Sequence, residues 1–221
     1  MASRAPVLTA TSLAKAFGPV PIVTDFSLTV RSGEAIALTG RNGAGKSTIL
    51  RMLVGAIRPD AGSVEFEGRR LVETDADVRR GVASVIDDLD FFPDLSVVEH
   101  LDLLARAHGV PDPEPLVDAV LAEVELVPQS GQLPGTLSSG QRRRLALGTA
   151  FVRPRKLLIL DEPEQRLDVA GVAWLAARLR KERQDGLAIV FASHDPYLVA
   201  QVATREVHLG GGAGGPTAEA D

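Results

Sequence analysis

One eight-residue segment, from Gly40 to Ser47, constrains this chain more than any other part of its sequence. Gly40 and Gly45 are separated by four residues and followed by Lys46 and Ser47, which is the pattern of a phosphate-binding loop. Apolar residues before it predict a buried strand, and the residues after it predict a helix. Glycine turns and a helix N-terminus direct N–H groups and partial positive charge at phosphate oxygens. Lys46 then reaches the terminal phosphates and Ser47 is placed to ligate Mg²⁺, so the segment predicts a nucleoside triphosphate site.

Length and composition narrow the class further. At 221 residues the chain has room for one α/β domain with an inserted subdomain, and we assign 1–221 to a single domain. A net charge of −5 argues against a nucleic-acid partner, because such proteins present a basic face. The absence of cysteine excludes disulfides, thiol catalysis and cysteine zinc sites, and it fits a reducing cytosol. We expect neither a signal peptide nor a membrane-spanning helix.

Hydrophobic patterning predicts an α/β architecture. Short apolar or alternating runs predict strands within residues 7–38 and at 64–67, 82–86, 157–160 and 187–192.

Outside these strands, the sequence pattern predicts helices and a tail. A capping box at Ser96 and Glu99, followed by helical spacing, predicts a helical insertion over about 91–150. The glycine-rich tail at 210–221 is expected to be flexible. Three histidines are expected at the surface: His100, His108 and His208.

Polar residues follow two of the predicted strands. Asp161 can hold Mg²⁺ directly or through water, and Glu162 beside it can act as a general base. Strands often end in acidic turn residues, so this assignment depends on the phosphate-binding loop being present. Ser193-His194-Asp195 follows another strand, at the carboxyl end where ligands bind in open α/β sheets.

A third segment, Leu137-Ser138-Ser139-Gly140-Gln141, precedes a predicted helix. Either serine can cap that helix, and the free N–H groups at its start form an anion site, although Ser-Gly caps are common. The order of the phosphate-binding loop, helical segment, Leu-Ser-Ser-Gly-Gln, Leu-Asp-Glu-Pro and Ser-His-Asp resembles the ATP-binding subunits of ABC transporters. This resemblance covers about residues 7–209.

The resemblance implies a fold and a set of site residues. The fold is that of an ABC ATPase of the P-loop NTPase class, with a mixed sheet core, an N-terminal antiparallel β subdomain and the inserted helical subdomain. ATP and Mg²⁺ are the implied cofactors. The implied metal ligands are Ser47, Asp161 and Asp87, and the implied catalytic residues are Glu162, His194 and Lys46. The implied ATP-binding residues are Phe17, Gly40, Arg41, Asn42, Gly43, Ala44, Gly45, Lys46, Ser47, Thr48, Ser138, Ser139, Gly140, Gln141 and Asp168.

Several positions depart from the family pattern. Phe17 stands where an adenine-stacking tyrosine is frequent, and a core phenylalanine is the other interpretation. Ser139 replaces the usual signature glycine, and residues 163–168 lack the usual small residues before Asp168. Asp87 replaces a glutamine that joins Mg²⁺ to the transmembrane partner. We expect Asp87 to engage only when Mg²⁺ and ATP are bound, the alternative being a solvated acidic turn.

Partners follow from the same resemblance. In the family the signature of one subunit closes over the nucleotide of another, so we expect a dimer with two sandwiched ATP molecules. A separate transmembrane permease is also implied, which places the chain on the cytoplasmic face of the membrane. The short domain is similar to export-type subunits, including the haem-exporter ATPase. An iron–sulfur assembly ATPase with a soluble partner is the alternative, whereas a nucleotide kinase would not explain the signature or Ser-His-Asp.

Overall fold

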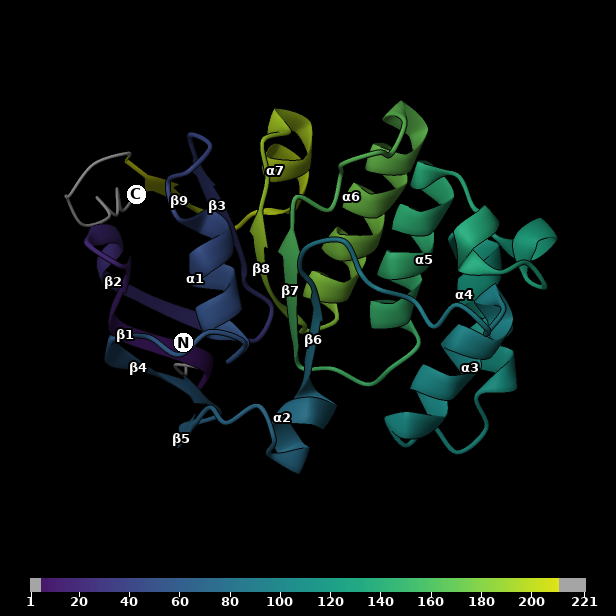
Figure 1. Ribbon diagram of the computed structural model, residues 1–221, viewed down its shortest axis with the longest axis horizontal. Coiled ribbons are helices and arrows are strands. Elements are labelled where there is room, and N and C mark those ends of the chain that lie inside the picture. Colours follow the sequence, from purple (N-terminus) through teal and green to yellow (C-terminus); the bar gives the residue numbers. More distant parts are fainter. Residues whose placement is uncertain (1–4, 211–221) are drawn as a thin grey trace.

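The computed structural model describes residues 5–210 and shows two sheets with helices packed around them (Figure 1). The antiparallel sheet has the order β2-β1-β4-β5 and the parallel sheet the order β6-β7-β8-β3-β9. The strands are β1 (Pro6–Phe17), β2 (Val20–Arg31), β3 (Ala35–Gly40), β4 (Ala61–Phe66), β5 (Arg69–Arg70), β6 (Val82–Val85), β7 (Leu157–Asp161), β8 (Ala188–Ala192) and β9 (Arg205–Leu209).

Seven α-helices lie within the described residues. They are α1 (Lys46–Leu53), α2 (Ala76–Gly81), α3 (Val97–Ala107), α4 (Glu114–Glu123), α5 (Ser139–Phe151), α6 (Val169–Gln184) and α7 (Pro196–Val202). Helix α1 lies between the two sheets, and its apolar residues share one core with both of them (Figure 1). Helices α5 and α6 cover the other face of the parallel sheet.

The parallel sheet determines where a site can form. Every residue of β7 and β8 is buried, which is the pattern of strands covered on both faces. Because β3, β7 and β8 are parallel neighbours, the segments that follow them emerge at one edge of the sheet. The expected combination of an antiparallel sheet with an α/β core is confirmed.

The helical insertion is present, with α3, α4 and α5 between β6 and β7. The Ser96 side chain accepts from the Glu99 N–H and Glu99 reaches back to the Ser96 N–H, which confirms the predicted capping box. The single-domain assignment stays a prediction, and residues 211–221 of the predicted flexible tail lie outside the described part of the chain.

The expectation for His100 was wrong. Its side chain is 3% exposed, whereas His108 is half-buried and His208 is exposed. The ring of His100 accepts from the Phe92 N–H at 2.8 Å through Nε2, and Nδ1 lies 3.0 Å from the Ser96 carbonyl oxygen. Both ring nitrogens have partners, so the imidazole can be buried as the Nδ1–H tautomer without losing hydrogen bonds.

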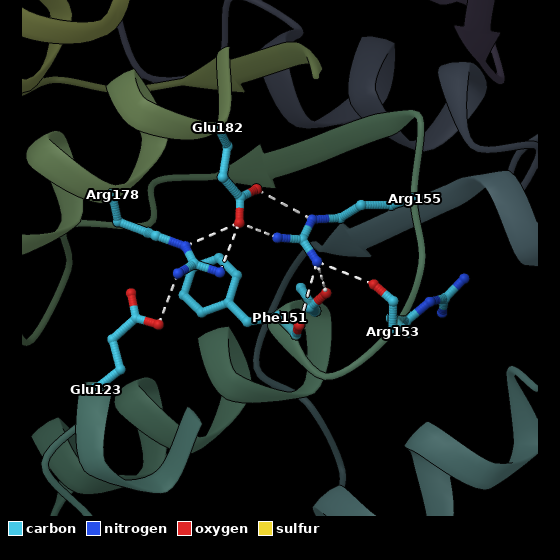
Figure 2. Close-up of polar contacts among 7 residues, drawn as sticks. Glu123, Phe151, Arg153, Arg155, Arg178 and Glu182 are labelled. Carbon is cyan, nitrogen blue, oxygen red and sulfur yellow. Dashed lines mark hydrogen bonds and ion pairs between the residues drawn. The ribbon is translucent and has the colours of Figure 1, made fainter. Parts of the chain in front are cut away.

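A charged network joins the helical insertion to the core (Figure 2). Arg178 on α6 donates to Glu123 on α4 at 2.7 Å and to Glu182 at 2.8 Å, and Arg155 also donates to Glu182. The Arg178 guanidinium lies 4.9 Å from the centre of the Phe151 ring. The side chains of Arg155 and Glu182 are 9% and 13% exposed, so the pair is shielded from solvent. Helices α4, α5 and α6 are thereby held together.

We predict that Glu182→Ala lowers the free energy of unfolding by about 2–3 kcal/mol, because it leaves the largely buried Arg155 guanidinium without a carboxylate and leaves Arg178 with Glu123 alone. Urea unfolding measures this change. Lys181→Ala is the matched control, since Lys181 is the exposed neighbour on the same helix. Equal losses for the two variants would contradict the stabilising role of the network.

Candidate nucleotide-binding and hydrolysis site

The turn from β3 into α1 shapes the phosphate-binding loop. Gly40 has φ 132°, and a Cβ atom there would lie 2.4 Å from the carbonyl oxygen of Leu209, so only glycine fits. Gly45 is the N-cap of α1 in the left-handed region at φ 93°. These conformations turn the backbone so that the N-terminal N–H groups of α1 face the loop.

Lys46 lies at the centre of the loop and is 5% exposed. Its Nζ donates to the carbonyl oxygens of Gly40 at 3.0 Å and Arg41 at 3.3 Å, and it lies 3.0 Å from Nε2 of His194. An ammonium group has three hydrogens to donate, and these three acceptors account for them. The loop therefore holds a desolvated positive charge where the motif predicts phosphates to bind.

Glu162 and His194 complete this group of side chains. His194 Nε2 lies 3.4 Å from Oε1 of Glu162, and Gln165 donates to Oε2. Because Lys46 has only donors, Nε2 accepts from Lys46 and cannot at the same time donate to Glu162. Glu162 has φ 43°, an uncommon conformation for a residue with a side chain, and such strain clusters at functional sites. The structure thus brings the three predicted catalytic residues into one contact chain.

The residues present fit a Mg²⁺ ion. Asp161 is 9% exposed, and its Oδ1 is buried with no hydrogen-bond partner within the described part of the chain. A buried carboxylate oxygen without a partner is costly unless a cation or donor occupies its remaining lone pairs. Ser47, in the first turn of α1, supplies the hydroxyl that the motif pairs with this aspartate.

Asp87 pairs with an arginine in the structure, and its role as a metal ligand stays a prediction. It forms a two-bond pair with Arg51 of α1, at 3.1 Å and 2.5 Å, and has φ 63°. Its neighbour Asp88 forms a second two-bond pair with Arg166, at 2.8 Å for both bonds. The two aspartates therefore connect the helix after the phosphate-binding loop to the segment after Glu162.

The predicted signature residues begin α5. The Ser138 side chain accepts from the Gln141 N–H at 3.2 Å, and Gln141 accepts from the Ser138 N–H at 2.9 Å, which forms a capping box. Ser138 and Ser139 are exposed. A Cβ atom at Gly140 would lie 3.0 Å from the carbonyl oxygen of Arg166, so the helix start packs against the segment after Glu162.

Two predicted residues lie apart from this group. Phe17 ends β1 with about half of its surface exposed, 5.8 Å from Lys15 Nζ, so it is not a core residue. Asp168 is the N-cap of α6 and accepts from the Gly171 N–H at 2.8 Å. Both residues are exposed, and their roles in binding ATP stay predictions.

Sequence reasoning missed three residues at the site: Arg143, Glu164 and Gln165. Arg143 donates to the carbonyl oxygens of residues 161–163, and Glu164 accepts from the backbone of His194. The sequence signal for Glu164 and Gln165 was that the segment 163–168 lacks the usual small residues, and Arg143 had none.

Comparison with known proteins agrees with this geometry. A family model described as ABC transporter matches residues 23–165. The SkfA peptide export ATP-binding protein SkfE of Bacillus subtilis is 35% identical over 187 residues, which are 84% of this chain and 77% of that protein. The spermidine/putrescine import ATP-binding protein PotA of Pseudomonas aeruginosa is 34% identical over 86% of this chain, which spans about half (53%) of that protein.

Solved structures agree as well. An ATP-binding subunit of an ABC transporter superimposes with a TM-score of 0.85 at 27% identity, covering 92% of this chain and 85% of that one. A bacterial ABC transporter cassette gives 0.82 at 20% identity, over 92% and 94% of the two chains, which shows the fold. This chain belongs to the ABC transporter family of ATP-binding domains. None of the helices in residues 5–210 has both the length and the apolar character of a membrane span.

We predict that Ser138→Ala lowers the free energy of unfolding by about 1 kcal/mol, because it removes the side-chain cap of α5, and that Ser138→Asp restores most of it. Ser139→Ala is the control, since its exposed side chain makes no hydrogen bond within the described residues. Urea unfolding of the three variants checks this. If Ser139→Ala lowers the free energy of unfolding as much as Ser138→Ala does, the side-chain cap does not stabilise the start of α5.

Proposed function

We propose that this chain is the ATP-binding and ATP-hydrolysing subunit of an ABC transporter and powers substrate export through a separate transmembrane permease. The observation that carries the proposal is the contact chain from Lys46 through His194 to Glu162. A phosphate-binding lysine and a carboxylate suited to accept a proton are there joined by one histidine. This arrangement suits hydrolysis of a terminal phosphate better than binding alone.

The chemistry follows from these residues. The backbone N–H groups of the loop and the Lys46 ammonium hold the phosphate oxygens, and the carbonyl oxygens of Gly40 and Arg41 keep the ammonium in place. Glu162 orients the attacking water and takes its proton, and His194 contacts the γ-phosphate. Charge that develops on the phosphate in the transition state is met by groups already fixed in place.

Mg²⁺ would be held by Asp161 and Ser47 and would supply neutralisation of phosphate charge. The buried, unpartnered Oδ1 of Asp161 supports this assignment. Asp87 joins this set only after it leaves Arg51, with which it pairs in the structure.

The partners are a second ATP-binding subunit and a permease, and no nucleic acid. The exposed start of α5, with Ser138 and Ser139, supports closure over the nucleotide of a second copy, as does the exposed Val169 beside Asp168. Attachment to a permease would place the chain at the cytoplasmic face of the membrane. Export is proposed because SkfE, which is 35% identical over 187 residues, is a peptide export ATP-binding protein.

We predict that Glu162→Gln keeps ATP binding but stops hydrolysis, because an amide cannot accept the proton, and that it accumulates an ATP-bound dimer. Lys46→Ala is expected to lose hydrolysis through weaker phosphate binding and to remain monomeric with ATP. Phosphate release and gel filtration with ATP and Mg²⁺ measure both effects. A monomeric Glu162→Gln protein with normal turnover would remove Glu162 from this role.

The Mg²⁺ requirement tests Asp87. We predict that Asp87→Ala raises the Mg²⁺ concentration for half-maximal hydrolysis several-fold, and that Arg51→Met lowers it, because Arg51 no longer competes for the carboxylate. Asp88→Ala is the matched control, since it removes the adjacent carboxylate that pairs with Arg166. Superimposable Mg²⁺ titrations for wild type and Asp87→Ala would leave Asp87 as a turn residue that pairs with Arg51.

A further inference from the structure

One carboxylate oxygen links the loop of Glu162 to the loop of His194. Oε1 of Glu164 accepts from the Ser193 hydroxyl at 2.6 Å and from the His194 N–H at 3.0 Å. The Ser193 hydroxyl oxygen in turn accepts from the Asp195 N–H at 3.0 Å. Ser193 is only 1% exposed, so its bond to Glu164 is shielded from water, whereas the bond from the His194 N–H lies in an exposed part of the loop. Glu164 therefore fixes the backbone that carries His194.

Arg143 holds the other side of the same loop. Its guanidinium comes from α5, is 7% exposed, and donates to the carbonyl oxygens of Asp161 at 2.7 Å and Glu162 at 2.6 Å, with a third bond of 3.2 Å to Pro163. Burial lowers the pKa of Arg143, and the Glu164 carboxylate opposes that shift. The positive charge of Arg143 and the negative charge of Glu164 therefore stabilise each other beneath the segment that carries Glu162.

Stability alone does not explain a carboxylate at position 164. Its second oxygen, Oε2, is buried and has no hydrogen-bond partner within the described residues. A carboxylate with one unsatisfied buried oxygen is costly, and such groups in native structures call for an explanation in function or strain.

We propose that Glu164 is a positioning residue for ATP hydrolysis, which sets the position of His194 relative to Glu162 and Lys46 by tying the two loops together. This inference rests on the proposed ATPase function. His194 Nε2 is 3.0 Å from Lys46 Nζ and 3.4 Å from Glu162 Oε1, so a small shift of its backbone breaks one contact or the other. Glu164 does not touch the reacting atoms and acts through the His194 backbone.

The test compares Glu164→Ala with Glu164→Gln in the full chain. Alanine removes the acceptor of both bonds and is expected to lower kcat for ATP by roughly 10- to 100-fold, the loss typical of a misplaced catalytic group, with little change in KM. Glutamine keeps an acceptor oxygen and is expected to recover most of that rate. Glu114→Ala, which removes an exposed carboxylate in the first turn of α4, is the matched control and should leave kcat unchanged.

The position of His194 can also be measured without ATP hydrolysis, by NMR. We expect the His194 ring signal in a ¹H–¹³C spectrum, identified by its loss in His194→Ala, to move in Glu164→Ala and to return toward its wild-type position in Glu164→Gln. If Glu164→Ala does not fold, Ser193→Ala removes one of the two bonds and should give a smaller shift and a smaller loss of kcat.

Two results would overturn the inference. One is a Glu164→Ala protein with kcat within about threefold of wild type, far from the loss expected for a misplaced group. The other is a lower kcat with an unmoved His194 signal. Failure of the proposed ATPase function would give a different result from failure of this inference. The wild type would then release no phosphate, or would release it no faster than Glu162→Gln does. The His194 signal would still show whether Glu164 positions that residue.

Discussion

The buried Lys46 ammonium is the group on which the rest of this site depends. Gly40 and Gly45 adopt backbone conformations that suit glycine, and these conformations bring the loop carbonyls to Lys46. A desolvated positive charge needs acceptors on every side. His194 from the loop after β8 supplies one of them, and Glu162 from the loop after β7 lies behind His194. The parallel order of β3, β8 and β7 delivers these segments to one edge of the sheet.

Local sequence patterns predicted much of this arrangement. The strand-loop-helix unit of β3 and α1, the buried runs of β7 and β8, the capping box at Ser96 and a serine cap before α5 depend on residues near each other in the chain. Elements without such patterns were missed. Strand β9 is an edge strand with exposed polar residues. In β1, register shifts around Ser12 interrupt the alternation of buried and exposed residues that would have marked its length. Burial of His100 depends on partners that only the folded chain provides.

Charged substitutions around the site are compensated by one another. Asp87 and Asp88 pair with Arg51 and Arg166, and Glu164 lies close enough to Arg143 for their charges to interact. The sequence predicted none of these pairs, because the two residues of each pair are 21 to 78 positions apart. Only the folded chain brings them close together. The unusual residues of the segment 163–168 are therefore part of one charged framework beneath Glu162. The fold supplies the edge of the sheet, and this framework fixes the loops that emerge there.

The most direct test of the account is the ATPase rate of the wild-type chain per mole of protein, measured over a wide range of protein concentration. If the signature of one copy completes the phosphate site of another, this specific rate rises with concentration and levels off as the dimer becomes the main species. A specific rate that stays constant while sedimentation shows only monomer would contradict the account, because one copy would then hydrolyse ATP without the signature of a second.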